Sequence, residues 1–199
     1  SEMCIRDRYE RHLSEKIDAV LAEMMSLDVS SAHRLLMEKI AEHTTVSKSV
    51  TLLGLDRGEF YIRLARRVEV KKFVSPNPRV TAMLKRLRAR SHIVVLHTNS
   101  GRDLARITLD ALGMDDSCYD LIITSDDKEP KPSEEGYLHI LAMTNAKPEE
   151  AIYVGDRFQV EVAPAKKLGM KTIFVGETSS AREADYTVNS VEEIENIVN

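Results

Sequence analysis

The chain has 199 residues, of which 30% are charged, and its formal net charge at pH 7 is −4. This length is enough to bury a sizeable apolar core. The nearly balanced charge gives no reason to expect nucleic acid as a partner. No stretch has the apolar length of a membrane span or of a signal peptide, so we expect no membrane partner and a cytoplasmic location.

The first eight residues, SEMCIRDR, differ in character from the sequence that follows. They resemble translated adapter sequence, and only Met3, Cys4 and Ile5 among them are apolar. We therefore interpret residues 1–8 as a non-native leader and expect the natural sequence to begin near Tyr9.

Residues 9–75 carry apolar side chains at helical spacing. One stripe of this kind runs through residues 13–24 and another through residues 32–40. Ser30 is placed to cap the second of these helices, and a third helix is expected after Asp56. We predict an all-helical domain in this part of the chain.

After Ser75 the pattern changes to short apolar segments that alternate with helical ones. Strands are expected at residues 92–97, 120–124, 151–154, 171–175 and 186–188. Such alternation is typical of a parallel sheet covered by helices on both faces. The sequence therefore predicts an α/β protein, with a Rossmann-like parallel sheet core in residues 76–199.

The helix expected just after Pro78 is rich in positive charge. Its basic residues are Arg79, Lys85, Arg86, Arg88 and Arg90. An apolar stripe lies between these charges, formed by Val80, Met83, Leu84 and Leu87. We therefore interpret the charges as the solvated face of a core helix and not as a nucleic-acid patch.

Polar side chains that could bind a ligand or take part in catalysis lie close to three of the predicted elements. Thr98 and Asn99 come directly after one strand, Lys131 lies between two prolines just before a helix, and Asp156 follows another strand, with Glu161 five residues later. The carboxyl ends of parallel strands share one edge of the sheet, where such folds bind ligands. Paired carboxylates there suit Mg²⁺, which prefers oxygen ligands and usually a phosphate as well.

This order of hydroxyl, lysine and acidic pair resembles the second, third and fourth motifs of the haloacid dehalogenase superfamily. The resemblance covers about residues 9–190. It implies that the helical segment of residues 9–75 is a cap domain, and residues 44–60 look most like the caps of pyrimidine 5′-nucleotidase-type members. The implied activity is Mg²⁺-dependent hydrolysis of a small phosphorylated metabolite, a nucleotide being one such substrate, through an aspartyl-phosphate.

The resemblance also implies a role for each of these residues. Thr98 and the amide of Asn99 hold the phosphate, and Lys131 neutralises charge on the phosphate and on the nucleophile. Asp156 binds Mg²⁺, and Glu161 holds the metal directly or through water. Glu161 departs from the family pattern, because the second acid is usually Asp, which is one methylene shorter.

A larger departure is that the first motif of the family has no match. This motif is an apolar strand that ends in Asp-x-Asp, and none occurs before Tyr9. Asp7 lies between two arginines and is interpreted as a solvated charge. We therefore expect the first core strand and the nucleophile to be absent from residues 1–199, and the chain as written to be inactive and poorly stable.

Two other functions stay open. A halocarboxylic-acid dehalogenase has the same fold but needs no metal, and the acidic pair argues against it. A catalytically inactive binding module would have kept the fold and lost the chemistry. The sequence does not indicate an oligomeric state.

Overall fold

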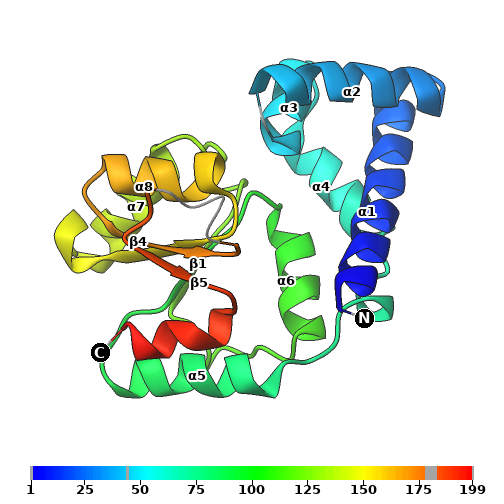
Figure 1. Ribbon diagram of the computed structural model, residues 1–199. Coiled ribbons are helices and arrows are strands. Elements are labelled where there is room, and N and C mark those ends of the chain that lie inside the picture. The colour runs from blue at the N-terminus through cyan, green and yellow to red at the C-terminus, as the bar shows by residue number, and fades with distance from the viewer. Residues whose placement is uncertain (1, 44, 178–182, 199) are drawn as a thin grey trace. The chain divides into compact units, whose positions relative to one another are not determined.

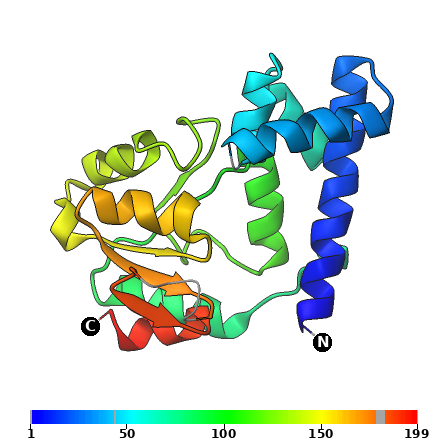
Figure 2. The same cartoon turned by 45° about the horizontal axis from the view of Figure 1, so that its top comes forward.

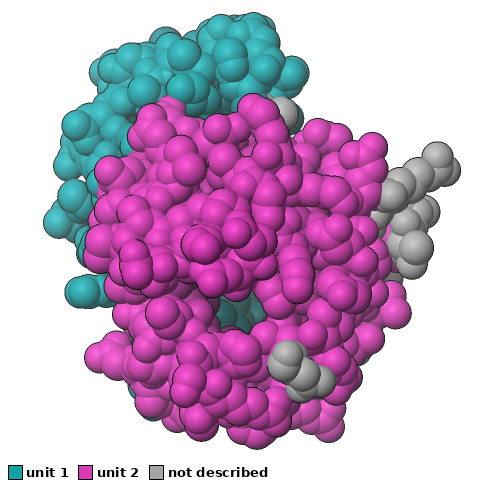
Figure 3. All heavy atoms as spheres, turned by 90° about the vertical axis from the view of Figure 1, so that its left-hand side faces the viewer, with its two compact units in different colours: residues 1–77, 98–115, 124–126 teal, residues 78–97, 116–123, 127–199 magenta. Residues whose placement is uncertain are grey.

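The computed structural model describes residues 2–43, 45–177 and 183–198. The chain divides into two compact units (Figure 3). Unit 1 contains residues 1–77, 98–115 and 124–126, and unit 2 contains residues 78–97, 116–123 and 127–199. The first break of the chain between the units thus follows Asn77, two residues beyond the end of the predicted cap.

Unit 1 is built from helices (Figure 1). They are α1 (Glu2–Met25), α2 (Val29–His43), α3 (Val46–Leu52), α4 (Arg57–Ala65), the short 3-10 helix η1 (Val70–Lys72) and α6 (Arg102–Ala111). Helix α4 contacts both α1 and α6. The apolar stripes that the sequence predicted form one core, in which Val20, Leu21 and Phe60 are fully buried. Since α1 begins at Glu2, residues 2–8 of the expected leader are helical.

Two acidic side chains begin helices of unit 1. Asp56 accepts a hydrogen bond from the Glu59 amide at 2.7 Å and caps α4, the helix that was predicted to follow it. The prediction that Ser30 caps α2 was wrong, because this helix already starts at Val29. The carboxylate of Asp28 accepts from the Ser31 amide at 2.9 Å and satisfies one of the unpaired donors at the helix start.

Unit 2 is a layered α/β structure (Figures 1 and 2). Its strands are β1 (Val95–His97), β2 (Leu121–Ile123), β3 (Ile152–Gly155), β4 (Lys171–Val175) and β5 (Tyr186–Val188). Its helices are α5 (Pro78–Ala89), α7 (Glu135–Thr144), α8 (Ala163–Lys167), the 3-10 helices η2 (Pro148–Glu150) and η5 (Val191–Asn196), and the π-helical turn η3 (Phe158–Val162). All five predicted strands are confirmed, and so is the α/β class.

The strands sort their side chains to two faces. Ile152 and Val154 of β3 pack with α5 and η5, whereas Tyr153 packs with α7 and α8. This alternation follows from the two-residue repeat of a strand. It produces the two covered faces that the βα pattern predicted, with α7 and α8 on one side and α5 and η5 on the other (Figure 1).

The strands form two separate parallel sheets. One has the order β1-β2, and the other has the order β3-β4-β5. Every residue of β1 and residues 152–154 of β3 are only half-buried, whereas Thr172, Ile173 and Phe174 of the internal strand β4 are buried. Figure 3 shows unit 2 hollowed by an opening on the face turned to the viewer. Among the described residues, no strand pairs with the free edge of β1 or of β3.

Helix α5 carries the basic residues that follow Pro78. Met83 and Leu87 are buried against β4 and β5, so the apolar stripe faces the core as predicted. Arg86 pairs with Glu195 at 2.6 Å, and Arg88 pairs with Asp120 at 2.6 Å. These ion pairs fit the interpretation of a solvated helix face. In the part of the chain that the structure describes, no helix combines the length and the apolar character needed to cross a membrane.

Candidate active site

Lys131 is a buried cation in unit 2. Its side chain is 5% exposed, and its ammonium donates hydrogen bonds to the carbonyl of His97 at 2.9 Å and to Glu161 Oε1 at 2.7 Å. Both partners lie beside strand ends, since His97 is the last residue of β1 and Glu161 belongs to the turn that follows β3. Lys131 is thus fixed at the carboxyl end of β1, at the residue that immediately precedes Thr98.

The carboxylate of Glu161 is held from two directions. Its Oε1 accepts from Lys131, while its Oε2 accepts from the backbone amides of Asp156 at 3.1 Å and Arg157 at 3.3 Å. Glycine is required at position 155, because a Cβ there would lie 2.8 Å from both Cβ and Oε2 of Glu161. Glu161 therefore ties the lysine loop to the loop that follows β3.

Burial and pairing act against each other in this ion pair. Burial by itself raises the pKa of Glu161, but the Lys131 ammonium and the two amides outweigh it and hold that pKa below its usual value. Burial lowers the pKa of the Lys131 ammonium, and Glu161 opposes this shift. A carboxylate with a charged partner and donated hydrogen bonds stays ionised, so the site contains a largely buried ion pair.

Asp156 stands at the opposite extreme of exposure. It directly follows β3, and its side chain is exposed, whereas the neighbouring Gly155 is buried. In residues 2–43, 45–177 and 183–198, no cluster of three or more His, Cys, Asp or Glu side chains is arranged to hold a metal. Mg²⁺ is often bound by only one or two carboxylates together with water and a phosphate. The donor set of Asp156 and Glu161 fits such a metal, with Asp156 as the solvent-accessible carboxylate.

Thr98 and Asn99 belong to unit 1. Thr98 Oγ1 accepts a hydrogen bond from the Ser100 amide at 3.1 Å. The carbonyl of Asn99 accepts from the Ser47 hydroxyl at 2.5 Å, and Ser47 is also hydrogen-bonded to the hydroxyl of Tyr61. The structure thus brings Lys131, Asp156 and Glu161 together within unit 2, and the convergence of Thr98 with them stays a prediction.

Three ring side chains beside Lys131 were not predicted as part of the site. His97, Tyr137 and Tyr153 pack with ring centroids 4.8 to 6.0 Å apart, and Tyr153 Oη lies 3.2 Å from His97 Nδ1. A Cβ at Gly136 would lie 2.4 Å from His97 Nε2, so any larger residue here would displace the His97 ring. Burial, followed by the nearby Lys131 charge, lowers the pKa of His97 to about 3, and the imidazole is neutral at pH 7. Alternation along the strands was the only sequence signal for this cluster, because it turns His97 away from the expected phosphate side.

Comparisons with known proteins show which proteins the chain resembles. The family model of haloacid dehalogenase-like hydrolases matches residues 4–169. A segment of 86 residues is 37% identical to glyceraldehyde 3-phosphate phosphatase of Methanocaldococcus jannaschii, covering 40% of this chain and 38% of that relative. A segment of 134 residues is 25% identical to ribulose-1,5-bisphosphate 5-phosphatase of Halopiger xanaduensis, covering 61% of this chain and 56% of that relative.

A solved structure shares the fold along the entire chain. The crystal structure of a HAD phosphatase from Thermococcus onnurineus superposes with a TM-score of 0.64 at 21% identity, covering 100% of this chain and 92% of that one. The chain spans less than two thirds of the two curated relatives, so those similarities concern parts of the proteins. With the family model covering most of the sequence, the chain belongs to the haloacid dehalogenase-like hydrolases.

Proposed function

We propose that the intact protein is a Mg²⁺-dependent phosphomonoester hydrolase that acts on a small phosphorylated metabolite in the cytoplasm. The observation that carries this proposal is the buried Lys131 ammonium, bonded to the residue before Thr98 and to Glu161. A fixed cation out of water is suited to an anionic phosphate, whose charge must be offset before a carboxylate can attack it. The phosphatase names of the two curated relatives support the same substrate class.

The remaining residues have separate roles in this proposal. Thr98 and the Asn99 amide hold the phosphoryl oxygens, and Asp156 with Glu161 holds Mg²⁺. When bound, the metal offsets charge on the phosphate. Lys131 keeps its own charge near the same group, and Glu161 keeps the Lys131 ammonium in place through the 2.7 Å ion pair. The aromatic cluster keeps water away from one side of that pair.

The nucleophile, in this proposal, comes from an additional strand between β1 and β3. Its carboxylate forms a bond to phosphorus while the ester bond to the leaving alcohol breaks, and a second acid gives that alcohol a proton. Water then cleaves the acyl phosphate and releases inorganic phosphate. The division of unit 2 into two sheets and the half-buried residues of β1 and β3 support a place for such a strand. Residues 1–199 alone are then inactive.

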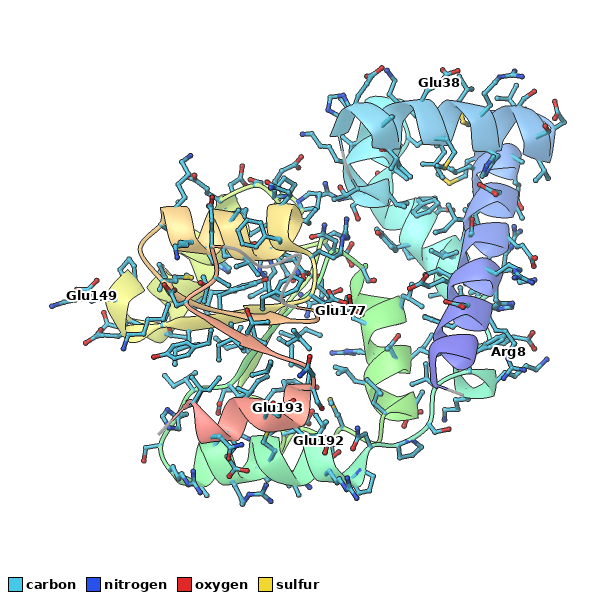
Figure 4. All side chains as sticks on the ribbon, viewed as in Figure 1. Arg8, Glu38, Glu149, Glu177, Glu192 and Glu193 are labelled. Carbon is cyan, nitrogen blue, oxygen red and sulfur yellow. The ribbon has the colours of Figure 1, made fainter. Side chains whose placement is uncertain are left out.

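The test compares residues 1–199 with a longer version that carries an apolar strand ending in Asp-x-Asp. Hydrolysis of an aryl phosphate with Mg²⁺ should appear only in the longer protein, and Asp156→Asn should abolish it with the fold retained. Glu149→Gln is a matched control, because Glu149 is an exposed acid of the same unit that points into solvent (Figure 4). Full turnover by residues 1–199 would contradict the proposed nucleophile.

The same experiment separates the two alternative functions. Dechlorination of a chlorocarboxylic acid by the longer protein in excess chelator would favour a dehalogenase. A folded longer protein that hydrolyses neither substrate would favour a catalytically inactive binding module.

A further inference from the structure

Tyr137 is a buried phenol whose ring and hydroxyl have different surroundings. The ring is 0% exposed and packs in a cluster with Leu141, Ala165 and Met170. The hydroxyl donates to the backbone carbonyl of Glu161 at 2.9 Å, with the carbonyl of Val160 at 3.2 Å from the same donor. The ring therefore fills the core, while the hydroxyl bonds the turn that carries Glu161.

The turn in question departs from regular α-helical hydrogen bonding. Residues 158–162 form a π-helical turn. This geometry is rare in proteins overall, and where it occurs it is often part of a functional site. Pro164 follows the turn, and proline has no backbone N–H. In an α-helix the backbone N–H of residue 164 would donate to the Val160 carbonyl, and Pro164 cannot supply it. The Tyr137 hydroxyl supplies a donor from a different helix, α7.

We propose that Tyr137 is a positioning residue for Glu161 and, through Glu161, for Lys131. By bonding the peptide carbonyl of Glu161, it fixes the direction in which that side chain leaves the π-helical turn. The carboxylate then meets Lys131 Nζ on one oxygen and the amides of Asp156 and Arg157 on the other. This inference rests on the proposed function in one respect, because that function gives the Lys131–Glu161 pair its catalytic role.

A packing role alone does not account for the hydroxyl. Phenylalanine would fill the same space in the cluster, and a buried hydroxyl costs free energy unless it is hydrogen-bonded. Gly155 leaves the room that the Glu161 side chain occupies, since a Cβ there would lie 2.8 Å from its Cβ and Oε2. The Tyr137 hydroxyl therefore fixes the peptide of Glu161, and Gly155 leaves room for its side chain.

The test is the Tyr137→Phe variant of the protein, followed by amide hydrogen exchange measured by NMR. The amides of Asp156 and Arg157 report on the carboxylate directly, because they donate to Glu161 Oε2. Loss of one buried hydrogen bond should speed their exchange by about fivefold to tenfold, with the amides of β4 unchanged. Tyr119→Phe is the matched control, because it removes an exposed phenol hydroxyl of the same unit.

Two results would overturn the inference. One is unchanged exchange at Asp156 and Arg157, and the other is faster exchange spread evenly over β3 and β4, which marks general loosening. If the variant does not fold, the unmodified protein provides the second measurement. Its Tyr137 hydroxyl proton should exchange slowly with water and show NMR contacts to Val160 and Glu161, and exchange as fast as that of Tyr119 would overturn the inference.

The exchange readout needs no turnover, so it stands apart from the proposed function. In a protein that hydrolyses aryl phosphate, Tyr137→Phe should lower kcat with little change in KM. A protein without any hydrolysis would defeat the proposed function and leave the exchange result to decide the role of Tyr137.

Discussion

The two units use buried space in different ways. The core of unit 1 is largely apolar and continuous across its helices, and ion pairs such as Arg63 with Glu23 lie at its surface, although Asp18 is buried where it meets His33. Unit 2 buries a lysine and half-buries its glutamate partner, and its strands stay in two separate sheets. Removing two charges from water costs more free energy than their attraction returns, unless the geometry of the pair is good. We therefore attribute the buried Lys131–Glu161 pair of unit 2 to its candidate active site and not to a gain in stability.

Removing the charge of Lys131 is the most direct test of this difference between the two units. Lys131→Met leaves the Glu161 carboxylate without its cation, and removing one partner of a buried pair costs about 3–5 kcal/mol. Urea unfolding followed by circular dichroism would measure the loss. Lys167→Met is the matched control, because Lys167 pairs with Glu134 while 77% exposed, and it should leave the midpoint unchanged. The double variant Lys131→Met with Glu161→Gln should recover part of the loss, and a double variant as unstable as the single one would count against the comparison.

The apolar side of the comparison is tested at Leu21. Leu21 is 0% exposed in the core of unit 1, and Leu→Ala at such positions costs about 2–5 kcal/mol because a cavity remains. Leu52 is 44% exposed, so Leu52→Ala should change the unfolding free energy by less than about 0.5 kcal/mol. Equal losses for the two variants would mean that unit 1 lacks the packed core described here.

Acid should destabilise unit 2 through His97. Burial lowers its pKa to about 3 from the usual 6.5 of histidine, so the unfolded chain binds the additional proton between these values. Stability from this group is present above pH 6.5 and is lost as the pH falls toward 3, by at most about 1.4 kcal/mol per pH unit. Urea unfolding at a series of pH values should show a shallower dependence in His97→Gln than in the unmodified protein. Identical slopes would exclude a buried neutral His97.

The smallest expected effect concerns the start of α4 in unit 1. Asp56→Ala removes the acceptor for the Glu59 amide, and loss of such a cap costs about 1 kcal/mol. Asp56→Asn keeps an acceptor and should retain most of the stability, as measured by thermal unfolding. A loss in Asp56→Asn as large as in Asp56→Ala would assign the effect to charge and not to capping.

Periodicity predicted the five strands and the longer helices, because it depends only on which side chains face a core, whereas the short helix α3 was not predicted. Helix starts were less certain, since Asp28 and Ser30 are both good caps and only the backbone geometry chooses Asp28. Lys131 and Asp156 could also be singled out, the first from its flanking prolines and the second from its place after an apolar strand. Their contacts could not, because the bond between Lys131 and Glu161 joins positions 30 residues apart and depends on a π-helical turn. Tyr137 occupies an apolar helix position, and nothing in its spacing reveals the partner of its hydroxyl.

The free edges of β1 and β3 have a consequence for association between molecules. An unpaired strand edge offers backbone donors and acceptors to any other extended chain, and natural proteins often protect such edges with lysine. The segments Val95–His97 and Ile152–Gly155 carry no acidic or basic side chain other than the neutral His97. The Lys131 ammonium, by occupying the carbonyl of His97, covers the last acceptor of β1. Within residues 1–199, the Lys131 ammonium thus leaves one backbone acceptor fewer at the edge of β1 for another extended chain to pair with.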